Sequence, residues 1–409
     1  MRSIIARALV NRAVRDVPVR VVYPDGSTQG SGGPDSPAIE IVEPSKLFRR
    51  VARNPKVGIG EGYVAGEWRV CEGTDLAEFF LPFAERLSGL LPDWLLRLRR
   101  LADRRLPTGH RNTLRGSRRN IEAHYDLSND LFALFLDETL SYSSAMFDPV
   151  VPRSDQSLES AQRRKIENAL DLAGVESGMR VLEIGSGWGS LAIAAAERGA
   201  HVTTITLSRE QQALARERVA AAGLGDQVDV VLRDYREVDG KFDAVVSIEM
   251  IEAVGDEYWA TYFEAIDRAL RPGGKAVIQA ILMDHDRYLT TRNSFGWIQK
   301  HIFPGGMIPS IEGLTAAGAG TELELSGVEA FGDDYAETLR RWRSRFLENW
   351  TRVAELGFDE QFRRTWEYYL AYCEVGFDAG YLDVAQLTFE KQLALETISL
   401  GQYELSRTA

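Results

Sequence analysis

The sequence predicts an α/β protein: a mainly parallel, doubly wound sheet preceded by a small α/β domain. Three observations predict this fold class. At 409 residues the chain exceeds one average domain. From residue 121 onward, short apolar runs rich in β-branched residues alternate with stretches of helical periodicity, the pattern of parallel strands covered by helices. A glycine-rich turn follows the first of these runs and opens a helix, as in sheets that bind ligands at their carboxyl edge.

The small N-terminal domain is predicted over residues 1–95. Its opening, MRSIIARALVNRAVR, has arginines and aliphatic residues at helical spacing and predicts a short amphipathic helix able to lie on a membrane. Apolar alternation around DG and GG turns predicts strands within 17–43. Helical periodicity in 45–55 and 74–87 predicts two helices that flank the glycine-rich GIGEGYVAGEW.

Charge sets the front of the chain apart from its body. Residues 1–120 carry 21 Lys and Arg against 13 Asp and Glu, a net charge of +8, whereas residues 121–409 carry 27 against 47, a net charge of −20. Nine arginines fall in 97–119, so 96–120 is predicted as a basic linker or a membrane-contact arm. The asymmetry predicts contact with an anionic membrane surface, with an ordinary imbalance of solvated charge as the alternative.

Hydropathy and cysteine content predict the location of the protein. No apolar run approaches the ~20 residues needed to cross a bilayer, and the start lacks the apolar core of a signal peptide. Cys71 and Cys373 are too few for a disulfide framework and show no zinc-ligand spacing. We therefore expect a cytoplasmic protein, peripheral on the inner face of the cell membrane, with no metal site and no nucleic-acid partner. An oligomer is compatible with the sequence.

The larger domain, residues 121–409, is predicted to alternate strands and helices. Its strands are expected in RVLEIG, HVTTITL, QVDVVL, FDAVVSI and KAVIQAI. Residues 284–314 interrupt this alternation and predict an insert. Two helices, near 334–356 and 359–378, then precede a final strand around 381–389.

The strongest motif, Glu183-Ile-Gly-Ser-Gly-Trp-Gly, ends the first of these strands. Gly185, Gly187 and Gly189 permit a tight turn and let backbone N–H groups approach a ligand, with a plain strand–helix turn as the alternative. The spacing differs from the GxGxxG of dinucleotide sites. No acid ends the second strand at Thr206-Leu207-Ser208, where a nicotinamide enzyme would hold a ribose.

The E-x-G-x-G pattern after the first strand resembles the class I methyltransferases, which bind S-adenosylmethionine. The resemblance implies a Rossmann-like, mainly parallel sheet of seven strands with a helical insert. It also implies that Glu183 sits behind the loop that faces the methionine end of the cofactor. Asp234, Tyr235 and Arg236, after the third strand, would flank the adenine.

Further motifs lie in order over residues 120–390: HYDLSNDLFALFLDETLSYSSAMF, GSGWGSLA, TLSREQQ, RDYRE, WIQKHIFPGGMIPS, DDYAETLRRW and YYLAYCEVGFDAGYLDV. Together they resemble the cyclopropane fatty acid synthase family. That family transfers a methyl group from S-adenosylmethionine to a cis double bond of a fatty acyl chain, usually within a membrane phospholipid. By position, the resemblance implies a cofactor site lined by Tyr142, Ser143, Gly185, Gly187, Gly189, Thr206, Leu207, Ser208, Gln211, Tyr235 and Arg236.

The chemistry of this family sets the demands on its site. An alkene is a poor nucleophile, so methyl transfer leaves a carbocation on the chain, which the site must stabilise, shield from water and relieve of one proton. In the synthases the base is a bound bicarbonate. By position, the resemblance implies that the groups binding it here would be Ser144, Glu252, Gln279, Tyr335 and the backbone amide of Ile281. Two of these differ from the family, which has Cys at the position of Ser144 and His at that of Gln279.

Glu249 is a second departure, because the synthases usually have Gly at this position. The pattern EMIEAVG, with IQAI, resembles instead the actinobacterial branch that makes tuberculostearic (10-methylstearic) acid. The resemblance implies an oleoyl substrate, a 10-methylene product and a separate reductase as partner. Our hypothesis is that Glu249 replaces bicarbonate as negative charge and proton acceptor. Repulsion from Glu252 would raise at least one pKa and favour a shared proton or a bridge to Tyr335.

Several alternatives remain open at this point. Glu249 could instead pair with an arginine or cap the next helix. A cyclopropane synthase would differ only in the fate of the cation, and the loss of Cys and His would suit a non-catalytic, lipid-presenting subunit. The insert around Trp297 is predicted as a lid over the acyl chain, with simple capping of the core as its alternative. Cys373 is expected to be structural packing.

Overall fold

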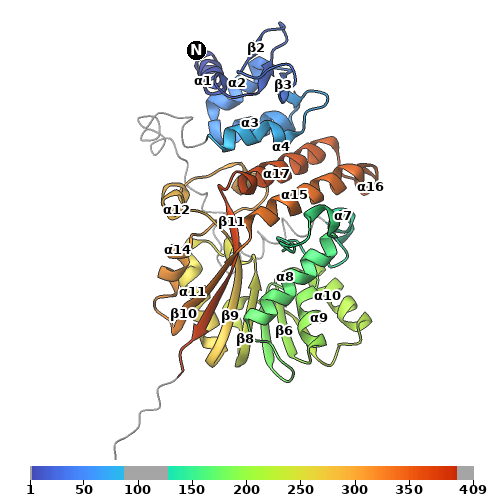
Figure 1. The fold of residues 1–409 in the computed structure, drawn as a ribbon, viewed down its shortest axis with the longest axis vertical. Coiled ribbons are helices and arrows are strands. Elements are labelled where there is room, and N and C mark those ends of the chain that lie inside the picture. Colours follow the sequence, from blue (N-terminus) through green and yellow to red (C-terminus); the bar gives the residue numbers. More distant parts are fainter. Residues whose placement is uncertain (1, 87–127, 394–409) are drawn as a thin grey trace, which may run out of the picture.

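The computed structural model describes residues 2–86 and 128–393. The basic segment 96–120, predicted as a linker or membrane-contact arm, lies outside the described residues. Figure 1 shows three layers in the described part: a small N-terminal unit, a pair of long helices beneath it, and a large twisted sheet with helices on both faces. Among the described helices, none is both long and apolar enough to cross a membrane.

The N-terminal unit, residues 2–86, contains helices and strands within the predicted domain 1–95, whose bounds stay a prediction. Strand β1 pairs with β2 in antiparallel and with β3 in parallel orientation, and β3 pairs antiparallel with β4. The predicted strands and flanking helices are all present. Its elements are α1 (Arg2–Val14), β1 (Arg20–Val22), β2 (Thr28–Gln29), β3 (Ala38–Ile41), α2 (Pro44–Arg53), α3 (Pro55–Val64), β4 (Trp68–Val70) and α4 (Leu76–Ala84).

The glycine-rich stretch of this unit is itself a helix, which the sequence did not predict. The Asn54 side chain caps α3 by accepting from the Lys56 N–H at 3.2 Å, and Pro55 occupies the first turn, where its missing N–H costs nothing. The glycines serve close packing: a Cβ on Gly60 would lie 2.6 Å from the Trp297 ring. Helix propensity is therefore outweighed here by tertiary contact.

The large sheet has the predicted seven strands, and their order is β10-β11-β9-β8-β5-β6-β7. Strands β5 to β9 pair in parallel, whereas β11 runs antiparallel to both β9 and β10. Because parallel strands end at the same edge, the segments after β5 and β8 lie side by side. The strands are β5 (Arg180–Ile184), β6 (His201–Thr206), β7 (Val228–Leu232), β8 (Phe242–Ile248), β9 (Leu270–Leu282), β10 (Leu323–Ala330) and β11 (Asp383–Lys391).

Strand β10 is the one element of this sheet that the sequence analysis missed. It lies at the sheet edge, and most of its side chains are exposed. An exposed edge strand needs no continuous apolar run, so LELSGVEA carries no such signal.

The α-helices of the described residues 128–393 are α7 (Asn129–Phe135), α8 (Leu158–Leu172), α9 (Ser190–Glu197), α10 (Arg209–Ala221), α11 (Trp259–Ala269), α12 (His285–Thr291), α13 (Trp297–His301), α14 (Ile311–Gly318), α15 (Gly332–Glu348), α16 (Trp350–Glu355) and α17 (Glu360–Asp378).

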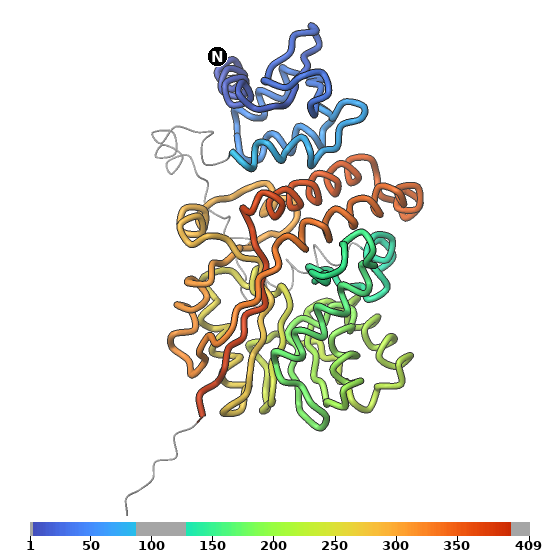
Figure 2. The backbone as a smooth tube through the Cα atoms, viewed as in Figure 1, coloured from blue at the N-terminus to red at the C-terminus, as the bar shows by residue number. Residues whose placement is uncertain are grey.

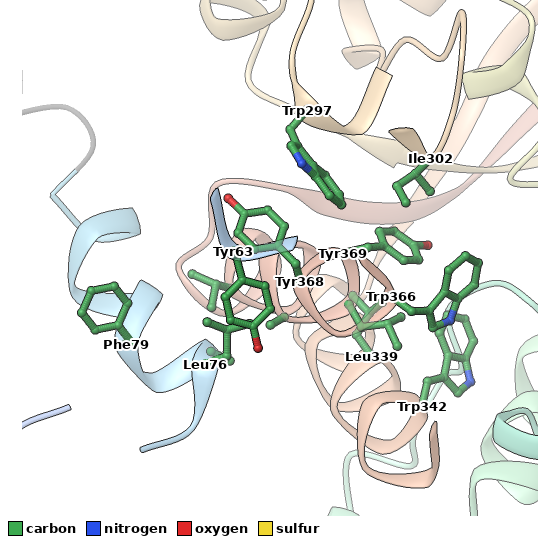
Figure 3. Close-up of a cluster of buried hydrophobic side chains, with 14 of the residues drawn as sticks. Tyr63, Leu76, Phe79, Trp297, Ile302, Leu339, Trp342, Trp366, Tyr368 and Tyr369 are labelled. Carbon is green, nitrogen blue, oxygen red and sulfur yellow. The ribbon is translucent and has the colours of Figure 1, made fainter. Parts of the chain in front are cut away.

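Helices α15 and α17 lie between the N-terminal unit and the sheet, as the chain traces in Figures 1 and 2 show. One continuous apolar core spans this junction, and Figure 3 shows part of it. The ring of Tyr368 lies 5.8 Å from that of Tyr63 on α3 and 4.7 Å from that of Trp297 in the insert. Arg343 of α15 adds a buried ion-pair network, with Asp75 at 2.6 Å and Glu374 at 2.9 Å. The N-terminal unit is thus packed firmly on α17.

Candidate active site

The glycine loop follows β5 at the carboxyl edge of the sheet. Gly185, Gly187 and Gly189 have φ angles of 97°, 47° and 91°, a region that glycine enters without steric cost. A Cβ at Gly185 would collide with the Met250 side chain. The amide N–H groups of Gly185 and Ser186 both donate to the Ile205 carbonyl, which ties the loop to β6. The loop conformation therefore requires glycine.

A cavity opens in front of this loop, between the segments that follow β5, β6 and β8 and the chain before α8. We call it the cofactor cavity. Glu249 lines it together with most of the predicted cofactor residues. The predicted cofactor residues that line it are Tyr142, Ser143, Glu183, Gly185, Gly187, Thr206, Leu207 and Gln211.

Other predicted cofactor residues do not line the cavity. Gly189 and Ser208 begin helices: Gly189 precedes α9, and the Ser208 hydroxyl caps α10 by accepting from the Gln211 N–H at 3.2 Å. Asp234, Tyr235 and Arg236 follow β7, where the Arg236 guanidinium donates to the Asp234 carboxylate at 2.7 Å. Contact of these three residues with an adenine stays a prediction.

The cavity fits the cofactor that the loop predicts. Glu183 is buried behind the loop, and its Oε2 atom has no hydrogen-bond partner in the described part of the chain. Burial raises the pKa of this carboxyl to about 8. A buried acceptor without a donor favours a ligand that brings hydrogen-bond donors or positive charge. S-adenosylmethionine carries both.

Glu249 stands directly after β8 in a strained backbone conformation. Its φ of 51° lies in the left-handed region, which is unfavourable for a residue with a side chain. Its N–H donates to the Gln279 carbonyl at 2.8 Å, which holds this conformation in place. Strain of this kind costs on the order of 1–3 kcal/mol and concentrates at functional sites. The result is a carboxylate that points into the protein at the cavity.

Three donors converge on the Glu249 carboxylate. The Ser144 N–H and the Gln279 amide donate to Oε1 at 2.8 and 2.9 Å, and the Tyr335 hydroxyl donates to Oε2 at 2.6 Å. These four residues form what we call the Glu249 cluster. The predicted bridge to Tyr335 is therefore present. In the described residues no arginine pairs with Glu249, and it does not cap the following 3₁₀ turn.

The electrostatics of Glu249 reflect two opposed effects. Burial raises its pKa, whereas the hydrogen bonds from Tyr335, Ser144 and Gln279 lower it, as does the charge of Lys165. Burial and the neighbouring Glu249 charge raise the pKa of the Tyr335 phenol well above its usual value. Tyr335 therefore acts as a fixed donor to Glu249.

Glu252 lies three residues further on and has different surroundings. Its Oε1 atom accepts from the Ile281 N–H at 2.5 Å, while Oε2 has no partner among the described residues. Burial, followed by the charge of Glu249, raises its pKa to about 8. This agrees with the expected repulsion between the two carboxylates. Below that pH Glu252 is mainly neutral, so Glu249 carries the negative charge.

Three of the five positions predicted to bind a bicarbonate donate hydrogen bonds to Glu249 instead. The Ser144 amide and the Gln279 side chain both donate to its carboxylate, while the Ser144 hydroxyl donates to the carbonyl of Ala145 at 2.9 Å. Gln386 of β11 donates to Gln279 Oε1 at 3.0 Å and so fixes the amide's orientation. Ser144, Gln279 and Tyr335 thus meet as predicted, around a carboxylate that belongs to the protein.

Lys165 is a buried charged residue that the sequence analysis missed. It lines the cofactor cavity from α8, and its Nζ donates to Ser143 Oγ at 2.7 Å. The signal was available, because Lys165 lies four residues from both Ala161 and Ala169, on the buried face of that helix. Cys373, by contrast, behaves as expected for packing: burial raises its pKa to about 12, so it remains a thiol.

The insert joins the N-terminal unit to the edge of the site. Trp297 is 4% exposed and packs on Tyr368 and Gly60, which favours the capping alternative for this residue. Further along, the Met307 N–H donates to the Glu252 carbonyl at 2.8 Å. The insert therefore reaches the acidic pair, and movement of this part as a lid stays a prediction.

Strand order, glycine loop and cofactor cavity together define a class I, S-adenosylmethionine-dependent methyltransferase. The chain belongs to the mycolic acid cyclopropane synthetase family, whose pattern matches residues 112–387. It is 48% identical over 392 residues to the tuberculostearic acid methyltransferase UfaA1 of Mycobacterium tuberculosis, covering 95% of this chain and 91% of that protein. It is 34% identical over 360 residues to the cyclopropane-fatty-acyl-phospholipid synthase of Escherichia coli, covering 87% and 88%.

Solved structures agree with this assignment. The cyclopropane synthase MmaA2 from Mycobacterium tuberculosis is similar with a TM-score of 0.62 and 31% identity, covering 67% of this chain and 98% of that one. The mycolic acid cyclopropane synthase CmaA1, complexed with SAH and CTAB, gives a TM-score of 0.61 at the same identity and coverage. The family and the fold class predicted from the sequence are thereby confirmed.

Proposed function

We propose that this protein transfers a methyl group from S-adenosylmethionine to the cis double bond of an oleoyl-type acyl chain in a phospholipid. The product is a 10-methylene chain, the precursor of 10-methylstearic acid, which a separate reductase would saturate. The observation that carries the proposal is the Glu249 cluster, in which three residues predicted to bind a bicarbonate donate hydrogen bonds to a carboxylate of the protein. The similarity to the tuberculostearic acid methyltransferase supports the same reaction.

The cofactor, the alkene and Glu249 each have a separate role in the proposed reaction. The cofactor, when bound in the cavity, supplies an electrophilic methyl group. The alkene's π electrons form the new bond to that methyl carbon as its bond to sulfur breaks and leaves its electron pair on sulfur, and a cation remains on the neighbouring chain carbon. The Glu249 carboxylate stabilises this cation electrostatically in a buried site. A hydride then moves from the methylated carbon to the cationic carbon, which places the cation on the carbon that bears the new methyl group. Glu249 accepts a proton from that methyl group, and the released C–H electron pair forms the methylene double bond.

Hydrogen bonding fits Glu249 to this role. Tyr335, Ser144 and Gln279 favour its charged form, whereas burial makes it more basic than a carboxylate in water. A base is most effective when its pKa approaches the working pH, so the two effects together suit proton abstraction. The strained backbone and three donors also fix the direction of its lone pairs. Glu252 supports the pocket by binding the Ile281 amide.

Replacing Glu249 with Gln tests the proposal. The variant keeps the shape but removes the charge, so cofactor binding should persist while methyl transfer to oleoyl phospholipid falls by ~10²-fold or more, the usual range for losing a general base. Added bicarbonate should not raise wild-type activity, and it should partly rescue Glu249→Gly. A wild-type enzyme that requires bicarbonate, or a Glu249→Gln variant at near-normal rate, would remove Glu249 from the mechanism.

The product distinguishes the proposal from the cyclopropane synthase alternative. Mass spectrometry of the released acid, before and after mild hydrogenation, separates the two, because a methylene group gains two hydrogens and a cyclopropane ring does not. A single-turnover assay with labelled methyl donor addresses the non-catalytic alternative: no label in the lipid would favour a lipid-presenting subunit. Expression with and without a partner reductase then shows whether the methylene chain is saturated.

A peripheral location on the inner face of the cell membrane is part of this proposal. Helix α1 leaves Ile4, Ile5 and Leu9 exposed by 72%, 54% and 51%, which suits shallow insertion into a bilayer. The arginine-rich segment 96–120 would add attraction of about 1 kcal/mol per basic residue. Replacing five of these arginines with Gln should weaken binding to anionic vesicles and reduce its salt dependence; unchanged binding would contradict the proposal. The five are Arg97, Arg99, Arg100, Arg104 and Arg105.

A further inference from the structure

Lys165 is a buried cation for which the reaction above has no use. It lies on α8 and is 2% exposed. Its Nζ donates to Ser143 Oγ at 2.7 Å, and both residues line the cofactor cavity. Among the described residues, Lys165 forms no ion pair. A lysine placed this way has no structural partner strong enough to offset its burial.

Three carboxyls face Lys165 from three elements. Glu183 comes from β5, Glu249 follows β8, and Asp137 follows α7, and each favours the charged lysine. On the β11 side the neighbour is the neutral amide of Gln386, which donates to the Lys165 carbonyl at 3.0 Å. Burial outweighs these attractions and lowers the pKa of Lys165 to about 8. The lysine is therefore close to losing its proton near neutral pH.

The cofactor brings a competing charge to the same cavity. S-adenosylmethionine carries a sulfonium, an ammonium and a carboxylate, and so one net positive charge, whereas its product S-adenosylhomocysteine has a neutral sulfur and no net charge. Two like charges in a buried cavity repel strongly, because the interior screens them poorly. The lysine and the sulfonium compete for the same carboxyls, and the lysine can relieve the repulsion by releasing a proton.

We infer that Lys165 is the resident cation of the cofactor cavity: it balances the carboxyls before cofactor binds and releases its proton to solvent when the methyl donor's positive charge enters. Binding of S-adenosylmethionine is thereby coupled to proton release, and binding of S-adenosylhomocysteine is not. The coupling makes the enzyme favour fresh donor over spent product as pH rises. This inference concerns cofactor binding alone, so it stands or falls separately from the acyl chemistry proposed above.

Calorimetric titration of the full chain with the two ligands tests the inference. The experiment compares buffers of different ionisation enthalpy across a series of pH values. Affinity for S-adenosylmethionine should fall about tenfold for each pH unit below about 8, with up to one proton released on binding. Affinity for S-adenosylhomocysteine should change much less. Both ligands share the amino and carboxylate groups, so the difference between them reports the sulfonium.

Two variants assign the proton to Lys165. Lys165→Met removes the charge and keeps most of the side-chain length, so the variant's selectivity between the two ligands should no longer change with pH. Lys165→Arg keeps a permanent charge and should bind S-adenosylmethionine weakly at every pH. Lys275→Met, on the exposed Lys275–Glu390 pair of β9 and β11, is the matched control and should behave as wild type. Binding of S-adenosylhomocysteine by each variant shows that its cavity is intact.

Glu183 is the competing source of a proton, because burial raises its pKa to about 8 as well. If Lys165→Met still releases a proton only with S-adenosylmethionine, and Glu183→Gln does not, the inference is overturned. Equal pH dependence for the two ligands in wild-type protein would overturn it too. Loss of the ligand difference in Lys165→Met, with the difference retained in Glu183→Gln, supports it.

Discussion

The glycine loop and the Glu249 cluster follow neighbouring parallel strands, yet they are fixed by opposite means. Gly185 after β5 and Glu249 after β8 both take left-handed backbone conformations, with φ angles of 97° and 51°. At the loop, glycine accepts this conformation without steric cost, and hydrogen bonds to the Ile205 carbonyl hold it. At Glu249 the same conformation is strained, and contacts from three distant segments hold it.

Cofactor recognition and the proposed proton transfer would thus depend on different structural features. A loop shaped by glycine can present the same backbone surface to a cofactor whatever the reaction. The cluster, by contrast, places one carboxylate by side-chain and backbone contacts from residues 144, 279 and 335, so its chemistry can change by substitution of single residues. In the proposed mechanism, the Glu249 side chain takes the room that a bicarbonate would need and is itself the base. The following changes perturb one region and leave the other intact.

The largest effect is expected from Gly185→Ala in the loop. The added Cβ would collide with Met250 and take an unfavourable φ, which costs on the order of 1–3 kcal/mol. Misplacing the loop should lower affinity for S-adenosylmethionine by roughly a hundredfold, since small displacements at a site have effects of this size. Calorimetric titration measures the affinity.

Gly225→Ala provides the matched control for this change. Gly225 has no atom within 4 Å of an added Cβ and no positive φ, so cofactor affinity should be unchanged. If Gly185→Ala also bound the cofactor normally, the loop would be an ordinary strand–helix turn. The glycine loop would then have no special role in binding the cofactor.

The two regions were also predictable from sequence to different degrees. The glycine loop can be recognised in the sequence because each of its positive φ angles favours glycine. The pattern GxGxG after a strand therefore predicts its place. The Glu249 contacts span up to 105 positions of the chain, from Ser144 to Glu249, and no local pattern encodes them. Family resemblance supplied those positions, while the hydrogen bonds from the Ser144 amide and Gln279 came only from the structure.

Elements were missed where local pattern and tertiary context disagree. Strand β10 is exposed at the sheet edge and carries no apolar run, whereas α3 is helical despite its glycines because neighbours pack closely on them. Lys165 was missed for a similar reason: a single lysine among five other charged residues of α8 looks like part of a solvated face. Only helical position relative to Ala161 and Ala169 distinguishes it.

A smaller effect, confined to the cluster, is expected from Tyr335→Phe. The variant removes the 2.6 Å hydrogen bond to Glu249, a donor that lowers the Glu249 pKa. Glu249 acts in its deprotonated form, so raising its pKa moves the acid limb of the kcat/KM profile to higher pH. The rate at neutral pH should fall by about tenfold, within the energy of a charge-assisted hydrogen bond, while cofactor affinity stays normal.

Tyr23→Phe is the control, because it removes a bond of equal length, 2.6 Å to Asn11, in the N-terminal unit. It should leave the pH profile in place. An unshifted profile in Tyr335→Phe would show that Tyr335 does not tune the base. A loss of cofactor affinity in that variant would instead mean that the two regions are not independent.

The smallest effect on activity is expected from Glu252→Gln, which asks whether the acidic pair contains one base or two. Burial and the charge of Glu249 raise the pKa of Glu252 to about 8, so below that pH the side chain is mainly neutral and Gln resembles it closely. The Gln oxygen can still accept from the Ile281 N–H. Activity at neutral pH should therefore change by less than about threefold, whereas Glu249→Gln lowers it by ~10²-fold.

The stability of Glu252→Gln gives an independent readout. A carboxyl whose pKa is higher folded than unfolded contributes stability at low pH that is lost as pH rises towards the folded value. Thermal unfolding of Glu252→Gln should thus match wild type near pH 5 and exceed it near pH 8. If Glu252→Gln instead lost activity as fully as Glu249→Gln, both carboxylates would take part in proton transfer.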